Sequence, residues 1–121
     1  MTIPSSEIIT IGDEILYGQT LDTNSKWMAF ELDKIGVKVI QITSIPDEEE
    51  AILNTIKAAE QRAGIILITG GLGPTKDDIT KKTIAKYFDS KLKINEKALA
   101  DVMAFFKQRG KELTALNRDQ A

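Results

Sequence analysis

The chain has 121 residues and a formal net charge of −2, with 42% hydrophobic and 28% charged residues. This length suits one domain, and this composition excludes collagen, low-complexity sequence and a largely disordered chain. The sequence contains no cysteine and no histidine, which excludes disulfides, thiolate metal sites and histidine-based acid–base chemistry. Any bound metal would take oxygen ligands, the donors that Mg²⁺ and Mn²⁺ prefer.

Targeting signals and charge narrow the possible partners. No apolar run approaches the ~18 residues of a membrane span, and residues 1–10 lack the basic flank and apolar stretch of a secretory signal. We therefore expect a cytoplasmic protein that binds no membrane. Residues 1–60 carry 4 basic and 11 acidic side chains, and residues 61–121 carry 12 basic and 7 acidic ones. The balanced total argues against nucleic-acid binding; the basic half is either solvated surface or partly phosphate-facing.

The first half of the chain predicts two strands and a helix. Residues 7–11 (EIITI) have the isoleucine content of a strand, and residues 12–23 form a long loop with two glycines and three acids. A helix capped by Thr23 or Asn24 then runs to about residue 35, with Gly36 at its C-terminal cap. Residues 37–45 predict a second strand. The expected apolar face of the helix consists of Trp27, Met28, Leu32 and Ile35.

The next segments predict a helix and a buried strand. Asp47 is placed to cap a helix, and Glu50 gives the spacing of a capping box. Residues 64–69 (GIILIT) form a nearly pure apolar run, typical of a strand buried on both faces in the centre of a parallel sheet. The expected buried stripe of the helix consists of Ile52, Leu53, Ile56 and Ala59.

The remaining segments follow a glycine-rich loop at residues 70–78 (GGLGPTKDD). A third helix is expected over residues 78–88, and Asn95 is placed to cap a fourth helix that ends at Gly110. Residues 111–121 form a polar tail. The apolar face of the fourth helix consists of Leu99, Val102, Met103 and Phe106.

The alternation of strands and helices predicts an α/β fold with a parallel sheet and helices on its faces. Three strands make a thin sheet, so we expect the chain to be a fragment that lacks later strands. Ligands of open parallel sheets bind beyond the carboxyl ends of the strands. Each expected strand is followed there by acidic residues, namely Asp13 and Glu14, then Asp47, then Asp77 and Asp78.

The loop at residues 70–78 has features of a phosphate site. Gly70, Gly71 and Gly73 permit unusual backbone angles and close approach of a ligand, the following helix N-terminus suits an anion, and Lys76 adds positive charge. The loop does not have the spacing of a Walker A sequence. It also lacks the third glycine of a dinucleotide-binding sequence. A simple strand-to-helix turn explains it equally well.

Other interpretations stay open for the remaining candidates. Asp47 and Asp78 could each be helix caps, and Asp13 with Glu14 could belong to an ordinary solvated loop. Lys81, Lys82 and Lys86 fit a solvated helix face. The large aromatic residues are expected in the core or at a partner surface; they are Trp27, Phe30, Phe105 and Phe106.

Three segments together resemble the N-terminal domain of the CinA (competence/damage-inducible) proteins, within the molybdopterin-binding superfamily. They are residues 11–19 (IGDEILYGQ), 22–24 (DTN) and 69–81 (TGGLGPTKDDITK). The resemblance runs from about Glu7 to the end of the chain, where Asn117, Arg118, Gln120 and Ala121 also match. It makes residues 1–121 one incomplete domain of this family and implies a three-layer α/β/α sandwich with a mainly parallel sheet.

The resemblance also implies an activity and its residues. Several CinA domains hydrolyse ADP-ribose with a divalent metal (Mg²⁺, Mn²⁺ or Co²⁺) and are stimulated by K⁺, whereas related adenylyltransferases bind the pterin phosphate and transfer AMP to it. Asp47 and Asp78 correspond to functional acids of the relatives, which makes them the expected catalytic and metal-binding residues. The expected substrate-binding residues are Gly70, Gly71, Gly73, Thr75, Lys76, Asp13, Glu14 and Asn24.

Three functions therefore remain in view: ADP-ribose hydrolysis, molybdopterin binding with or without adenylyl transfer, and a non-catalytic binding module. Each of the first two implies a small nucleotide or pterin ligand, and the resemblance implies a homodimer. The family's later strands, with a second small-residue loop that completes the cleft, and the C-terminal deamidase domain of many CinA proteins have no counterpart in this chain.

Overall fold

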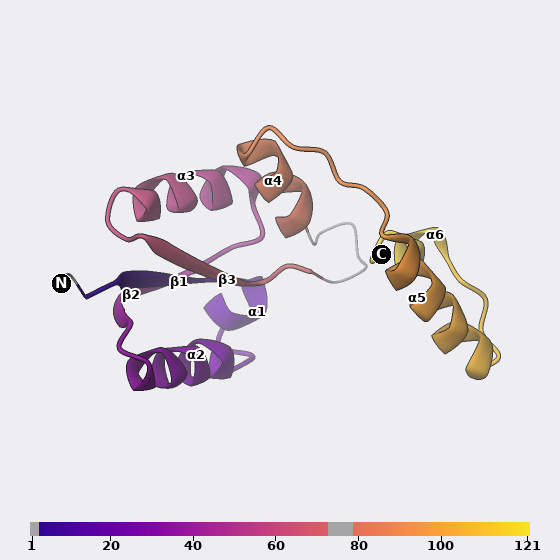
Figure 1. Ribbon diagram of the computed structural model, residues 1–121, viewed down its shortest axis with the longest axis horizontal. Coiled ribbons are helices and arrows are strands. Elements are labelled where there is room, and N and C mark those ends of the chain that lie inside the picture. Colours follow the sequence, from indigo (N-terminus) through magenta and orange to yellow (C-terminus); the bar gives the residue numbers. More distant parts are fainter. Residues whose placement is uncertain (1–2, 73–78) are drawn as a thin grey trace.

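The computed structural model describes residues 3–72 and 79–121, apart from the side chain of residue 116. Within them, β1 (Ser5–Ile11), β2 (Lys38–Ile45) and β3 (Ile65–Gly70) form one sheet in the order β2-β1-β3 (Figure 1). Both strand pairs are parallel, and Ile11 lies opposite both Ile45 and Gly70. The carboxyl ends of all three strands therefore lie together at one end of the sheet, which we call the carboxyl-end edge.

Helices cover both faces of this sheet. α1 (Asp13–Leu16) and α2 (Thr23–Lys34) lie on one side, and α3 (Glu49–Glu60) and α4 (Thr80–Tyr87) lie on the other (Figure 1). The expected three-layer α/β/α arrangement is confirmed. Two further helices, α5 (Glu96–Gln108) and α6 (Ala115–Arg118), lie beyond the sheet at the end of a long connection (Figure 1). No helix within the described ranges is long and apolar enough to cross a membrane.

The main core lies between the sheet and α3. Ile9 and Ile11 of the central strand and Ile45 of β2 pack there against three buried residues of the helix, which are Ile52, Ile56 and Ala59. Burial of each isoleucine contributes about 1.5–3 kcal/mol, so this cluster fixes α3 on the sheet. The predicted stripe is confirmed at these three positions, whereas Leu53 is only half-buried.

An ion pair between a buried carboxylate and an exposed arginine also fastens the sheet. Glu7 of β1 is 1% exposed, and its two carboxylate oxygens each accept a hydrogen bond of 2.8 Å from the Arg62 guanidinium. This fork geometry satisfies a carboxylate that could not otherwise be buried at tolerable cost. It ties the start of β1 to the turn between α3 and β3.

The helix starts differ from those expected. The cap of α2 is Asp22, whose carboxylate accepts a hydrogen bond from the Ser25 amide at 3.1 Å, so the expectation of Thr23 or Asn24 was wrong. The N-cap of α3 is Glu48, which makes no side-chain cap bond. Asp47 is therefore not the N-cap residue of α3.

The solvent-facing surfaces also differ from those expected. On the predicted apolar face of α2, Met28 and Leu32 are half-buried, but Trp27 is 65% exposed and Ile35 is exposed too. Phe30 of the same helix is 63% exposed. Phe105 is exposed and Phe106 is half-buried, so none of the four aromatic residues named above is buried. The expectation that they lie in the core was wrong, and the expectation that they face a partner stays a prediction.

The position of β3 in the sheet corrects another expectation. Ile65 is exposed and the other residues of β3 are half-buried. Among the described strands, only β1 pairs with β3, so β3 is an edge strand and β1 occupies the centre. The apolar run correctly predicted a strand but not its place in this sheet.

Hydrogen bonds hold the C-terminal helices together, and one from Lys81 joins them to α4. Asn95 caps α5 by accepting from the Ala98 amide at 2.9 Å, as predicted. The Lys81 ammonium donates to the Asp119 carbonyl at 2.9 Å, and the Asn95 amide donates to the Ala121 carbonyl at 2.9 Å. On the predicted apolar face of α5, Leu99 is buried, Val102 and Phe106 are half-buried, and Met103 is exposed.

Candidate functional site

The carboxyl ends of the strands are closely packed against one another. The Gly12 amide donates to the Ile45 carbonyl at 3.0 Å, which joins the ends of β1 and β2. Gly70 has φ +97°, and a methyl group on it would overlap the Ile11 carbonyl oxygen. Only glycine combines this left-handed backbone with so close an approach. The chain thus leaves β3 directly against the end of the central strand.

Gly71 brings the next element to the same place. Its φ is +64°, and a methyl group on it would overlap the Thr80 hydroxyl and lie 2.9 Å from Asp47 Oδ1. The Thr80 amide donates to the Gly71 carbonyl at 3.4 Å, which fixes the start of α4 beside the turn. The structure therefore gathers the predicted residues Asp47, Gly70 and Gly71 around the N-terminal end of α4, together with Thr80.

A second polar cluster lies at the start of α2. Thr10 of β1 contacts Asp22 Oδ2 at 2.9 Å and the Ser25 hydroxyl at 2.8 Å. Burial raises the pKa of Asp22, but hydrogen bonds from Ser25 and Thr10 lower it by more, so this pKa lies below its ordinary value. The Asn24 amide group donates to the Thr69 hydroxyl at 3.4 Å, so this predicted residue lies beside the end of β3.

The two acids of the first loop occupy different environments. Asp13 begins α1 and is half-buried, whereas Glu14 is exposed. The Glu14 carboxylate folds back toward Gly12, where an added methyl group would lie 2.5 Å from its Oε1. Both residues lie at the edge expected for the site, in a short helix rather than a loop.

Five candidates of the glycine-rich loop lie outside the described residues. They are Gly73, Thr75, Lys76, Asp77 and Asp78. Their expected roles in phosphate binding, metal binding and catalysis stay predictions.

Sequence reasoning missed Thr80, Thr69 and the Thr10–Ser25 pair. Thr80 and Thr10 are 2% and 3% exposed, although both side chains are polar. For Thr10 the sequence offered one signal: it is the only threonine among the isoleucines of EIITI, and burying a polar side chain in a strand is costly unless the side chain is hydrogen-bonded. For Thr80, its place just after a glycine-rich loop was the only indication.

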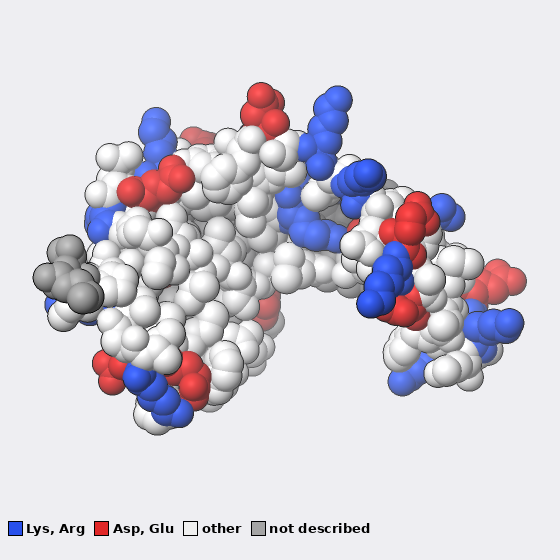
Figure 2. Space-filling view, in the orientation of Figure 1, with Lys and Arg blue, Asp and Glu red and all other residues white. Residues whose placement is uncertain are grey.

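Basic side chains gather near this region, in the surface between the sheet body and α5 (Figure 2). Two lysines of α4 have partners, because Lys81 donates to the Asp119 carbonyl and Lys86 forms an ion pair with Glu49. Lys82 is exposed. The solvated interpretation of this helix face is therefore supported for Lys82 and for Lys86, whose ion pair is exposed, whereas Lys81 is half-buried.

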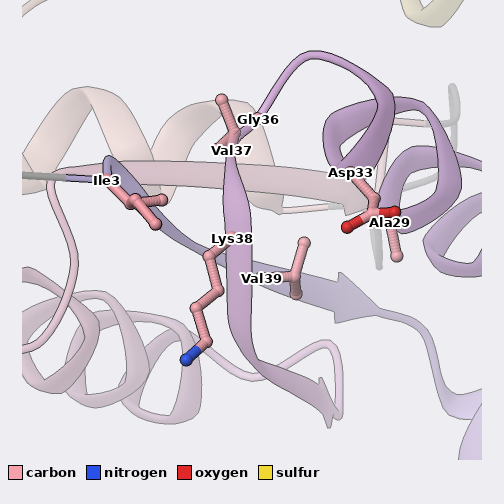
Figure 3. Close-up of a pocket in the computed structure, with 7 residues that line it drawn as sticks. All are labelled: Ile3, Ala29, Asp33, Gly36, Val37, Lys38 and Val39. Atoms are coloured by element: carbon pink, nitrogen blue, oxygen red, sulfur yellow. The ribbon is translucent and has the colours of Figure 1, made fainter.

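A groove among the described residues lies at the opposite end of the strands (Figure 3). It measures about 460 Å³ and lies where β2 begins, beside α2. The charged groups of Asp33 and Lys38 point to different sides (Figure 3). Its other lining residues are apolar or glycine: Ile3, Ala29, Gly36, Val37 and Val39. A groove without converging polar groups gives little specificity for a charged ligand.

A divalent cation fits this donor set only in part. Within the described residues no three acidic side chains come together as a metal cluster. Asp47 supplies one buried carboxylate oxygen beside the Gly71 turn. Mg²⁺ is commonly held by one or two carboxylates, with waters completing its shell. The second expected ligand, Asp78, lies outside the described residues.

These features define a class of protein. A parallel α/β/α fold that brings a glycine turn, a helix start and a carboxylate to the carboxyl ends of its strands belongs to the group that binds ligands at that edge.

Comparison with known proteins identifies the family. The family model described as "Probable molybdopterin binding domain" matches residues 7–119, and the chain belongs to this family. The CinA-like protein of Cytophaga hutchinsonii is 51% identical over 116 residues, which make up 96% of this chain and 28% of that protein. The chain thus spans less than a third of the length of this curated relative.

Solved structures agree with this assignment. The protein CinA of Thermoplasma acidophilum, described as having unknown function, has a TM-score of 0.81 and 32% identity, covering 94% of this chain and 66% of that one. The tungsten cofactor synthesizing protein MoaB of Pyrococcus furiosus has a TM-score of 0.67 and 24% identity, covering 90% and 68%. The second likeness supports the fold alone.

Proposed function

We propose that this domain binds a nucleotide diphosphate at the carboxyl-end edge of its sheet and, as part of the complete protein, hydrolyses ADP-ribose to AMP and ribose 5-phosphate. The observation that carries the proposal is the packing of Gly71 against Asp47 and Thr80 at the start of α4. This packing places a glycine turn, a helix N-terminus and a carboxylate within one small region. Those are the groups that a phosphate ester and its hydrolysis require.

Each of these groups has a role in the proposed reaction. The first turn of α4 leaves N–H groups without intrahelical partners, and these would bind the diphosphate. Asp47 and Asp78 would hold the divalent metal. When bound, such a metal neutralises phosphate charge and lowers the pKa of a bound water. Asp13, Glu14 and Asn24 would contact the remainder of the ligand, since they surround the same edge.

The chemical balance of the reaction is simple. The oxygen atom of water forms a bond to one phosphorus atom, and the bond from that phosphorus to the bridging oxygen breaks. One proton of the water ends on the released phosphate or in solvent. No oxidant, reductant or second substrate is needed, so the only further requirements are a divalent cation and the orientation of the diphosphate.

The test is formation of AMP from ADP-ribose, followed by chromatography, with Mg²⁺, Mn²⁺ or Co²⁺ and with or without K⁺. We expect Asp47→Asn to lower kcat by about 100-fold or more, the usual range for loss of a group acting at the reacting centre. Asp33→Asn, on the exposed side of α2, is the matched control and should leave kcat unchanged. No AMP from the complete, unsubstituted protein with any of the three metals would contradict the proposed activity.

A second candidate is binding of molybdopterin, with or without adenylyl transfer. The family match over residues 7–119 favours it, since the family description names that ligand. Calorimetric binding of a phosphorylated pterin together with no binding of ADP-ribose would support this candidate over hydrolysis.

The homodimer implied by the resemblance stays a prediction, to be checked by sedimentation.

A further inference from the structure

Thr80 stands out among the buried polar residues. It is the first residue of α4, and only 2% of its surface is exposed. Its hydroxyl oxygen is shielded from solvent and has no hydrogen-bond partner among the described residues. A buried hydroxyl left in this state costs about 1–3 kcal/mol, so its presence calls for a reason.

Packing does not supply that reason. Valine has nearly the same shape as threonine and would fill the same space without a polar atom to desolvate. The helix start does not supply it either, since the Thr80 backbone amide, and not the hydroxyl, bonds to the Gly71 carbonyl. Among the described residues, the hydroxyl therefore makes no hydrogen bond that a methyl group would forfeit.

The surroundings of the hydroxyl indicate its use. A Cβ atom on Gly71 would lie within 2.9 Å of both the Thr80 hydroxyl oxygen and Asp47 Oδ1. The absence of that side chain leaves the two oxygens facing the same small space. A hydroxyl is a donor and a carboxylate is an acceptor, so a small movement would join them.

We infer that Thr80 is a positioning residue for Asp47: when a nucleotide diphosphate binds, the Thr80 hydroxyl donates a hydrogen bond to Asp47 Oδ1 and holds the carboxylate in its working orientation. This inference rests on the proposed function and assigns a residue that the family resemblance did not single out. Thr80 itself touches no ligand atom; it acts through Asp47.

The test compares Thr80→Val with Thr80→Ser, measuring both ADP-ribose binding by calorimetry with Mg²⁺ and thermal unfolding of the free protein. We expect Thr80→Val to weaken binding about tenfold, the usual effect of removing one hydrogen bond to a charged group, while Thr80→Ser stays within about twofold of the unsubstituted protein. The unfolding midpoint of the free Thr80→Val protein should be unchanged or higher. Thr83→Val, at a buried threonine one turn further along α4, is the matched control and should not alter binding.

A double-mutant cycle isolates the path through Asp47. In an Asp47→Ala background, Thr80→Val should weaken binding less than twofold, because the acceptor is gone. An equal loss in both backgrounds, or a lowered unfolding midpoint of free Thr80→Val, would overturn the inference. If Asp47→Ala binds ADP-ribose too weakly to measure, the comparison of the single variants decides: a Thr80→Ser protein that binds as weakly as Thr80→Val would overturn the inference. Absence of binding to the unsubstituted protein refutes the proposed function and this inference with it, whereas normal binding with a silent Thr80→Val refutes the inference alone.

Discussion

Replacing Gly71 by alanine tests how closely the turn after β3 packs against its neighbours. The backbone of Gly71 has φ +64°, and holding an alanine in this left-handed region costs about 1–2 kcal/mol. The added methyl group would also overlap the Thr80 hydroxyl and lie 2.9 Å from Asp47 Oδ1. Both side chains would have to move, and overpacking of this kind costs about 1–3 kcal/mol more. We expect Gly71→Ala to destabilise the fold by about 2–5 kcal/mol in total.

Gly36→Ala is the matched control for this substitution. Gly36 ends α2 with φ +80°, and a methyl group on it would meet no atom within 4 Å. It therefore carries the conformational cost alone, about 1–2 kcal/mol. Urea unfolding followed by helical circular dichroism measures both variants. Equal destabilisation by the two would refute the close packing of Gly71 on Asp47 and Thr80.

Two further predictions concern the polar groups of β1 and α2. Arg62→Ala should lower the unfolding midpoint well below that of Lys34→Ala. The first substitution leaves the Glu7 carboxylate buried and unpaired, whereas the second removes an ion pair that is exposed at both ends. Equal midpoints of the two variants would contradict this prediction. Asp22→Asn should destabilise the fold above pH 3.8, the ordinary pKa of the group. Because the folded-state pKa of Asp22 is lowered, its stabilising contribution is lost as the pH falls through that pKa, so the difference in unfolding free energy should narrow below pH 3.8. A difference that widens in acid would show that the charge on Asp22 does not stabilise the fold.

The α/β/α layers could be predicted because hydrophobic periodicity and turn signals agree in this sequence. The run EIITI, the β-branched segment before Pro46 and the apolar run after Gly64 each correspond to a strand. The stripe of Ile52, Ile56 and Ala59 also matched its buried face. In each of these elements a local pattern and the tertiary packing favour the same structure.

Short helices and exact caps could not be predicted in the same way. α1 and α6 have four residues each, too few for a periodic pattern to be visible. The predicted cap of α2 was one or two residues too late because Asp22, Thr23 and Asn24 are all suitable caps. Tertiary bonds decided between them, since Thr10 of the neighbouring strand donates to Asp22.

Burial was the least predictable property. Trp27 and Phe30 face solvent although they are large and apolar, and β3 lies at an edge although its sequence suits a centre. Periodicity tells which residues share a face but not what covers that face. For the site, the convergence of strand ends placed Asp47 beside Gly71 correctly, whereas Thr80 depends on the packing of α4, which no local pattern encodes.

The most direct test of the proposed site is the mapping of ADP-ribose on the protein by backbone amide chemical shifts, in the presence of Mg²⁺. We expect the largest changes at the carboxyl-end edge, at the amides of Gly12, Gly70, Gly71 and Thr80. Changes confined to the groove at the opposite end of the strands, at Ile3 and residues 36–39, would contradict a nucleotide site at their carboxyl ends.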